Sequence, residues 1–146
     1  SPDAGGIERT RGLAKKINAD LAIIDKRRPV AGKSQVMNII GDVKNKNCII
    51  VDDIIDSGGT IVNAVEALKN KGALDVYVFV THAVLSGSAI NNIKKSKIKK
   101  LVITDSIDNS KRIKNNSKIQ VLSIAPLMAE AIKRISNSTS VSDLFN

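Results

Sequence analysis

Short apolar runs alternate with segments of helical periodicity along the whole chain. The runs predict strands at residues 21–24, 36–40, 48–51, 76–80, 101–104 and 119–123. Apolar residues spaced three and four apart predict helices at residues 7–17, from residue 61 to the glycine at position 72, at residues 89–95 and at residues 127–135. Such alternation is typical of an α/β domain, in which helices flank a mostly parallel sheet.

Three segments depart from this simple alternation. Residues 25–34, DKRRPVAGKS, contain four cations, a proline and a glycine without apolar periodicity, which predicts a solvated, mobile loop. The run at residues 48–51 is apolar at every position, which predicts a buried central strand. The Ser-rich residues 136–142 predict a surface turn. No repeat and no long linker divides the chain, so residues 1–146 are interpreted as one domain.

Composition narrows the functional classes. The chain has 146 residues, of which 42% are hydrophobic and only 2% aromatic, which disfavours a nucleic-acid binder built on aromatic stacking. No apolar stretch approaches the roughly eighteen residues of a membrane span, so no membrane partner is expected. The only cysteine, Cys48, lies in an apolar run and has no partner for an internal disulfide, so a reducing cytoplasm is the expected location.

Net charge predicts an anionic ligand. Lys and Arg number 23 against 14 Asp and Glu, which gives a formal charge of +9. A phosphate-rich ligand, a nucleic acid and an anionic surface all fit this excess. The densest basic run, Lys94 to Lys100, is more simply a solvated helix end than a nucleic-acid patch.

The segment from Ile49 to Thr60 carries the strongest candidate chemistry. An apolar strand leads into the paired acids Asp52 and Asp53, and ligands of parallel α/β sheets bind at the carboxyl ends of strands. These carboxylates can accept hydrogen bonds from sugar hydroxyls or hold a cation. The segment therefore contains half of a site for a phosphorylated sugar.

The other half is the small-residue stretch that follows. Small or absent side chains let backbone N–H groups approach an anion at the positive end of a helix, which predicts a phosphate site. The stretch comprises Ser57, Gly58, Gly59 and Thr60. The simpler alternative is that Asp56 or Ser57 merely caps the helix, but a cap gives no reason for two acids beside the strand.

These residues resemble the phosphoribosyl-pyrophosphate (PRPP) signature of the type I phosphoribosyltransferase fold. Further similarity to the ribose-phosphate pyrophosphokinase (PRPP synthetase) family lies at residues 1–6, 25–29, 36–43, 81–82, 85–87, 129–132 and 134–137. The resemblance covers essentially the whole chain. It matches only the C-terminal half of the family's subunit, a tandem of two related domains, so the N-terminal half is absent here.

The resemblance implies transfer of the diphosphoryl group of MgATP to the C1 hydroxyl of ribose 5-phosphate, which gives PRPP and AMP. Lys26 and Arg28 match the family's mobile catalytic cations, and Asp3 matches its aspartate for Mg2+. A homo-oligomer, a hexamer in the family, is also implied. The implied ligands of the ribose hydroxyls are Asp52 and Asp53, and those of the 5-phosphate are Asp56, Ser57, Gly58, Gly59 and Thr60.

Other functions remain as alternatives. In the first alternative, the chain is a non-catalytic module of the same family, with a ribose-phosphate-binding or regulatory role. Nucleic-acid binding is the second, and it predicts an affinity that falls steeply with salt and no response to ribose 5-phosphate. The only histidine, His82, has no metal-ligand partners at suitable spacing, which favours a structural role.

The start of the chain carries one further expectation. Asp3 and Asp52 reach one ligand only if both emerge at the same sheet edge, which predicts a strand immediately before Ser1. We therefore expect the domain to stay folded only beside such a segment, and this chain alone to be inactive.

Overall fold

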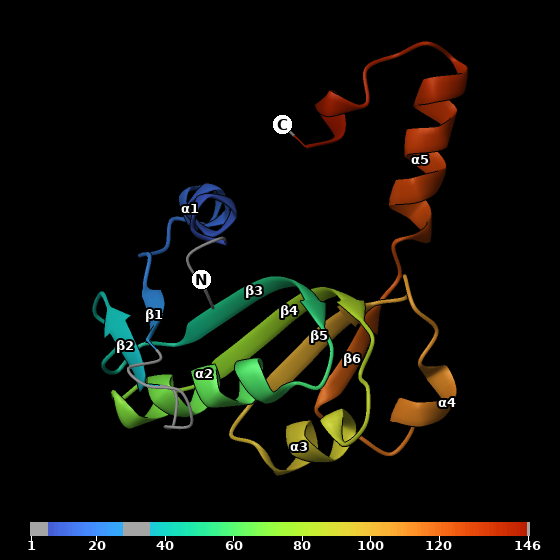
Figure 1. Cartoon of the computed structure of the whole chain (residues 1–146). Coiled ribbons are helices and arrows are strands. Elements are labelled where there is room, and N and C mark those ends of the chain that lie inside the picture. Colours follow the sequence, from blue (N-terminus) through green and yellow to red (C-terminus); the bar gives the residue numbers. More distant parts are fainter. Residues whose placement is uncertain (1–5, 28–35, 146) are drawn as a thin grey trace.

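The computed structural model describes residues 6–27 and 36–145 (Figure 1). The side chains of residues 26, 27, 36 and 37 are outside this description. The expectations for Asp3, for Arg28 and for a mobile loop through residue 34 therefore fall largely or wholly outside the described residues.

The sheet is parallel and has helices on its faces, as the alternating pattern predicts. Its strands are β3 (Cys48–Ile55), β4 (Val76–Ala83), β5 (Lys100–Thr104) and β6 (Ile119–Leu122), in the order β3-β4-β5-β6. The helices α2 (Gly59–Asn70) and α3 (Ala89–Lys95) cover one face (Figure 1). The predicted α/β class is confirmed.

The core lies between this face and its helices. Alternate strand residues point to the same side of a sheet, and residues three and four apart share one side of a helix. The resulting core includes Ile50, Val78, Leu101 and Ile103 of the sheet and Ile61, Ala64, Val65 and Leu68 of α2, each at most 4% exposed. Gly72, at φ +88°, follows α2 as predicted.

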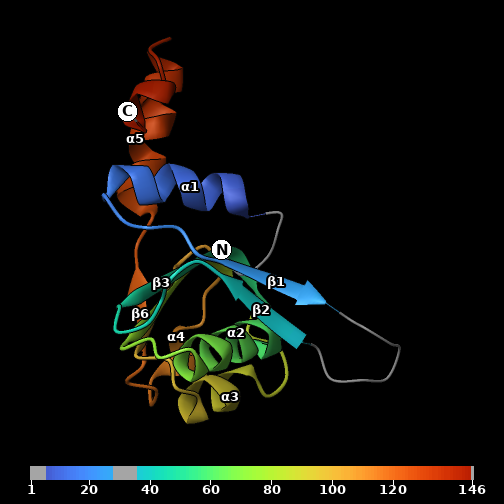
Figure 2. The same cartoon turned by 90° about the vertical axis from the view of Figure 1, so that its left-hand side faces the viewer.

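A second, two-stranded sheet lies beside this body. β1 (Ile23–Arg27) and β2 (Val36–Ile40) pair antiparallel, below α1 (Ile7–Lys16) in the view of Figure 2. The prediction that residues 25–27 belong to the loop is wrong. Asp25 pairs with Asn38, and cross-strand pairing of this kind needs no apolar periodicity.

The position of β3 also differs from the prediction. β3 is an edge of the described four-stranded sheet instead of a central strand, and Ile49 is 43% exposed. It also continues past residue 51, because Asp52, Ile54 and Ile55 pair with Val80, His82 and Ala83 of β4. The paired acids therefore lie within β3 itself and not after its end.

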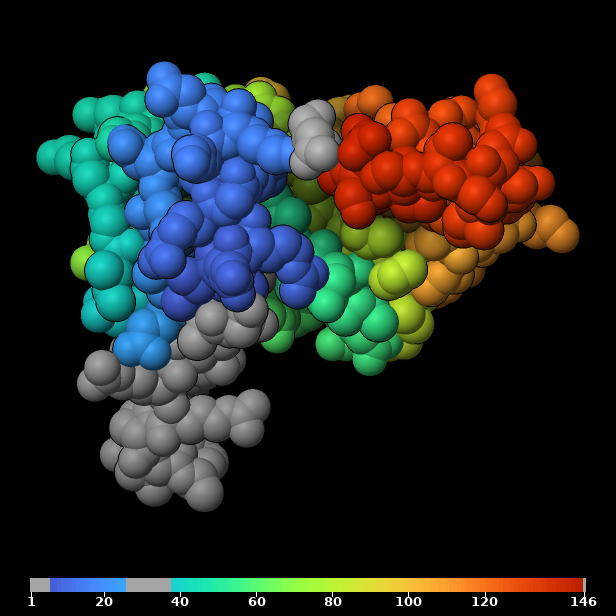
Figure 3. Space-filling model, turned by 90° about the horizontal axis from the view of Figure 1, so that it is seen from above, coloured from blue at the N-terminus to red at the C-terminus, as the bar shows by residue number. Residues whose placement is uncertain are grey.

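The C-terminal part stands apart from the core. α5 (Ala125–Ser136) projects from the end of β6, and none of its residues is buried (Figure 1). Seen from above, α1 and the C-terminal residues occupy the same side of the molecule, where the Lys16 ammonium donates to the Phe145 carbonyl (Figure 3). The short elements α4 (Ser110–Ile113) and η1 (Ser142–Leu144) were not predicted. No helix among the described residues is long and apolar enough to cross a membrane.

Candidate functional site

The two paired acids lie near the carboxyl end of β3. Asp52 is partly buried and Asp53 is exposed, and the Asp53 N–H donates to Asp52 Oδ1 at 3.0 Å. Arg9 of α1 reaches the same place, with Nη1 3.5 Å from Asp53 Oδ2. Partial desolvation raises the pKa of Asp53, but its own backbone N–H and the Arg9 charge outweigh this, so the pKa lies below its ordinary value. The acid is therefore a carboxylate at neutral pH.

The turn between β3 and α2 leaves the start of the helix open. Gly58 has φ +78°, a left-handed conformation that glycine adopts without a steric penalty, and it occupies the N-cap position. No side chain caps α2 with a hydrogen bond. The alternative in which Asp56 or Ser57 caps the helix is therefore wrong. First-turn N–H groups of a helix have no partner within it, so they can receive an anion here.

Together these elements form one local arrangement. Asp52 and Asp53 precede the turn, residues 56–58 form it, and Gly59 and Thr60 begin the helix. Two backbone hydrogen bonds hold this turn in place. Val84 N–H donates to Ile55 O at 3.0 Å, and Ser86 N–H donates to Asp56 O at 3.2 Å. The predicted sugar and phosphate ligands are thus consecutive along a rigidly supported strand, turn and helix.

A polar network at the ends of β4 and β5 was not predicted. His82 Nδ1 lies 3.0 Å from Ser106 Oγ, and the hydroxyls of Ser106 and Thr104 both donate to Thr81 O, at 3.0 and 2.7 Å. Thr104 and Ser106 belong to a different strand end from His82, so only the parallel pairing of β4 and β5 reveals the network. His82 is exposed, and its structural role stays a prediction.

The side chains of the remaining predicted residues lie outside the description. Lys26 lies in β1, with its side chain outside the description, and Arg28 and Asp3 are outside the described residues. Within residues 6–27 and 36–145, no three His, Cys, Asp or Glu side chains gather as a metal site.

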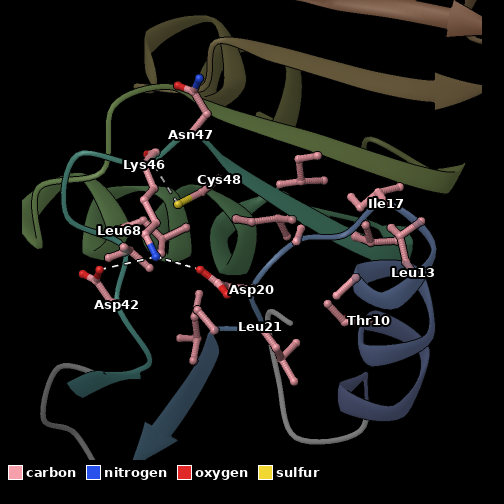
Figure 4. Close-up of a pocket in the computed structure, with 18 of the residues that line it drawn as sticks. Thr10, Leu13, Ile17, Asp20, Leu21, Asp42, Lys46, Asn47, Cys48 and Leu68 are labelled. Carbon is pink, nitrogen blue, oxygen red and sulfur yellow. Dashed lines mark hydrogen bonds and ion pairs between the residues drawn. The ribbon is translucent and has the colours of Figure 1, made fainter.

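A cavity of about 340 Å3 lies between α1 and the first half of β3, and neither of the paired acids lines it (Figure 4). Lys46 at its rim forms ion pairs with Asp20 and Asp42, at 2.8 and 3.4 Å. A backbone hydrogen bond from Lys44 and the Lys46 ammonium lower the pKa of Asp42. The half-buried Cys48 also lines the cavity, and burial raises the pKa of its thiol. Among the described residues that line the cavity, Lys46 is the only cation and it is paired with two carboxylates, so this lining is net negative and does not suit a phosphate.

Comparisons with known proteins agree on one family. The family model described as "Phosphoribosyl synthetase-associated domain" matches residues 8–146. The chain is 57% identical over 147 residues to a ribose-phosphate pyrophosphokinase of Hyphomonas neptunium, covering 100% of this chain and 47% of that protein. It is 56% identical over 146 residues to the enzyme of the same name from Brucella melitensis, again covering 100% and 47%.

A solved structure is similar as well. The crystal structure of phosphoribosylpyrophosphate synthetase from Mycobacterium smegmatis is 36% identical, with a TM-score of 0.81, over 94% of this chain and 44% of that one. The chain thus spans about half the length of the curated relatives it matches.

Proposed function

Because the chain belongs to the phosphoribosyl synthetase-associated domain family, we propose that it is a ribose-phosphate diphosphokinase domain. In this proposal it corresponds to the C-terminal half of a two-domain subunit, which transfers the diphosphoryl group of MgATP to the C1 hydroxyl of ribose 5-phosphate. The products are PRPP and AMP, and PRPP is a precursor for nucleotide biosynthesis. The curated relatives' name supports the activity, and their coverage of about half supports the assignment to one half of such a subunit.

The observation that carries the proposal is the uncapped start of α2 directly after two carboxylates. A helix N-terminus favours negative charge, and its free N–H groups suit a phosphate. Carboxylates a few residues away suit the hydroxyls of the attached ribose. Ribose 5-phosphate has both groups, so its 5-phosphate would bind at residues 56–60 and its hydroxyls at Asp52 and Asp53.

Transfer of a phosphoryl-type group needs positioning and charge stabilisation more than a protein nucleophile. The C1 hydroxyl of the sugar is the attacking group, and the bond between the α- and β-phosphates of ATP breaks. Lys26 and Arg28 are the proposed cations that stabilise charge on the transferred phosphates. Because they act on ATP, they are assigned no part in holding the sugar.

The proposed cofactor, Mg2+, fits the donors at this edge. Mg2+ prefers oxygen ligands and commonly keeps several waters while it contacts one or two carboxylates and substrate phosphates. Asp3 is the proposed ligand of the ion, and Asp52 and Asp53, which are assigned to the ribose hydroxyls, provide further carboxylate oxygens at this edge. When bound, the ion would neutralise charge on the phosphates of ATP. A cytoplasmic location and a homo-oligomer, a hexamer in the resembled family, complete the proposal.

A charge placed at the start of α2 tests the phosphate site. Thr60→Glu puts a carboxylate on an exposed residue in the first turn, where it favours the helix but repels a phosphate. We expect ribose 5-phosphate to bind at least roughly 10-fold more weakly, with no fall in the unfolding temperature. Titration calorimetry with Mg2+, on the natural protein that contains this chain, measures the affinity.

The matched control is Asn70→Glu, which adds the same charge at the exposed last residue of α2. Its affinity for ribose 5-phosphate should stay near that of the unaltered protein. Equal affinity in both variants would exclude the start of α2 as the phosphate site. Binding that falls steeply with salt for a nucleic acid, without any response to ribose 5-phosphate, would favour the nucleic-acid alternative.

A further inference from the structure

The loop behind the phosphate turn contains an unusual backbone conformation. This loop, residues 84–88 between β4 and α3, includes Leu85, which has φ +53° and is fully buried. A leucine rarely adopts a left-handed conformation, because its Cβ crowds the following carbonyl. Such a conformation persists only where surrounding contacts enforce it, and it is a frequent feature of functional sites.

The contacts that enforce it come from α4. The Arg112 guanidinium donates through Nη1 to Val84 O at 3.2 Å and through Nη2 to Leu85 O. The buried Asn109 amide donates to Ala83 O at 2.6 Å. Arg112 Nη1 also donates to Asn109 Oδ1 at 3.2 Å, which joins the two side chains. Three consecutive carbonyls, those of residues 83, 84 and 85, are therefore fixed by two side chains of a single short segment.

The opposite side of the same loop faces the phosphate turn. The N–H groups of Val84 and Leu85 donate to Ile55 O at 3.0 and 3.2 Å, and that of Ser86 donates to Asp56 O at 3.2 Å. Ala89 packs close to the turn, because a Cβ added to Gly58 would lie 3.8 Å from the Ala89 Cβ. The loop is thus a direct physical link: α4 holds its carbonyls, and its N–H groups hold the turn.

We propose that Arg112 and Asn109 are positioning residues for the 5-phosphate site, acting through the Leu85 loop on the Asp56–Gly58 turn. This inference rests on the proposed function. The planar guanidinium is suited to the role, because its fixed fork reaches two carbonyls and an amide oxygen at once, which a lysine ammonium does with poorer geometry. Neither side chain touches the substrate in this proposal.

Neutralising Arg112 tests the link. In the natural protein that contains this chain, Arg112→Met keeps an apolar stem but removes all three hydrogen bonds. We expect the dissociation constant for ribose 5-phosphate to rise by roughly 10-fold, because the turn loses its enforced conformation. The KM for ATP should change little. Arg112→Lys should recover part of the affinity.

Lys111→Met is the matched control. It removes the same charge from the neighbouring, exposed position of α4 and therefore reports any long-range effect on an anionic substrate. Its affinity should equal that of the unaltered protein. If Arg112→Met and Lys111→Met have the same affinity, the positioning role is excluded.

Stability must be separated from positioning. The dissociation constants are measured well below the unfolding temperature of each variant, so a purely structural role would lower that temperature and leave the affinity unchanged. That result would overturn the proposal. A double variant, Asn109→Ala with Arg112→Met, should lose less affinity than the product of the two single losses, because the residues share one network. Losses that simply multiply would show that the two residues do not act together.

Thr60→Glu, measured in the same titration, distinguishes the two proposals. If Thr60→Glu weakens binding as expected while Arg112→Met leaves the affinity unchanged, only the positioning role fails. If Thr60→Glu binds ribose 5-phosphate as tightly as the unaltered protein, the proposed phosphate site itself fails, and the positioning role with it.

Discussion

Both faces of the four-stranded sheet carry apolar side chains, but only on one face are they buried beneath helices; we call this the closed face and the other the open face. On the face that α2 and α3 cover, Ile50 and Val78 are 2% and 0% exposed. Their immediate neighbours in sequence on the other face, Ile49 and Phe79, are 43% and 39% exposed. α1 and α5 lie on that side of the molecule (Figures 1 and 3), but both side chains remain partly exposed to solvent.

The two faces therefore differ in how much they stabilise the strands that position the candidate site. The closed face contributes the apolar burial that holds β3 and β4 together, and the candidate site depends on where those strands end. The open face contributes much less to the free energy of unfolding, because water remains in contact with it. Substitutions on the two faces should therefore have unequal effects even where the residue type and the strand are the same.

The largest expected effect comes from two adjacent isoleucines of β3. Ile50→Ala should lower the free energy of unfolding by about 2–5 kcal/mol, because it leaves a cavity in the core. Ile49→Ala should lower it by only about 1 kcal/mol, because nearly half of that side chain is already solvated. Chemical denaturation of both variants measures the difference. Equal losses would mean that the second face is as closed as the first.

A smaller effect should follow from making the open face polar. We expect the unaltered protein to bind a hydrophobic dye, and Ile49→Thr with Phe79→Thr to reduce its fluorescence at saturation. Threonine suits a strand, so the free energy of unfolding should change by no more than about 1 kcal/mol. An unaltered protein that binds no dye would contradict the exposure of this face.

The contrast between the faces also explains what the sequence could predict. The helix at residues 89–95 was placed correctly, and the helices that begin near Ile7 and Ile61 were located from apolar spacing alone. This works because apolar periodicity reflects which side of an element is buried. The same signal reveals neither which apolar face is covered nor how many strands pair with a given strand, so it did not show that β3 is an edge of the described sheet with Ile49 exposed.

For the candidate site, the sequence predicted the proposed ligand-binding residues but not the side chains that hold them in position. The paired acids and the glycines at 58 and 59 are contiguous, so one short segment was enough to find them. The contacts of Asn109 and Arg112 with residues 83–85 join segments more than twenty residues apart through backbone carbonyls. Any residue provides such carbonyls, so no residue pattern at 83–85 marks this partnership.

The smallest expected effect concerns the hinge that leads to α5. α5 buries none of its residues, and polar contacts hold the segment just before it: the Ser123 hydroxyl and the Ile124 N–H both donate to Asp105, the latter at 2.9 Å. The Ser123 hydrogen bond, followed by that of Ile124, lowers the pKa of Asp105 below its ordinary value of 3.8. A lowered folded-state pKa means that these contacts are fully present above the ordinary value and are lost as pH falls through the lowered one.

An NMR titration of the Ile124 amide tests this polar anchor. We expect the amide shift to stay constant from neutral pH to about pH 5 and to change with a midpoint below the ordinary 3.8, because the amide loses its carboxylate acceptor when Asp105 is protonated. In Asp105→Asn the acceptor carries no titrating charge, so this transition should vanish, and the free energy of unfolding should change far less than in Ile50→Ala. A midpoint at or above 3.8 would mean that Asp105 does not hold the Ser123–Ile124 segment through its carboxylate.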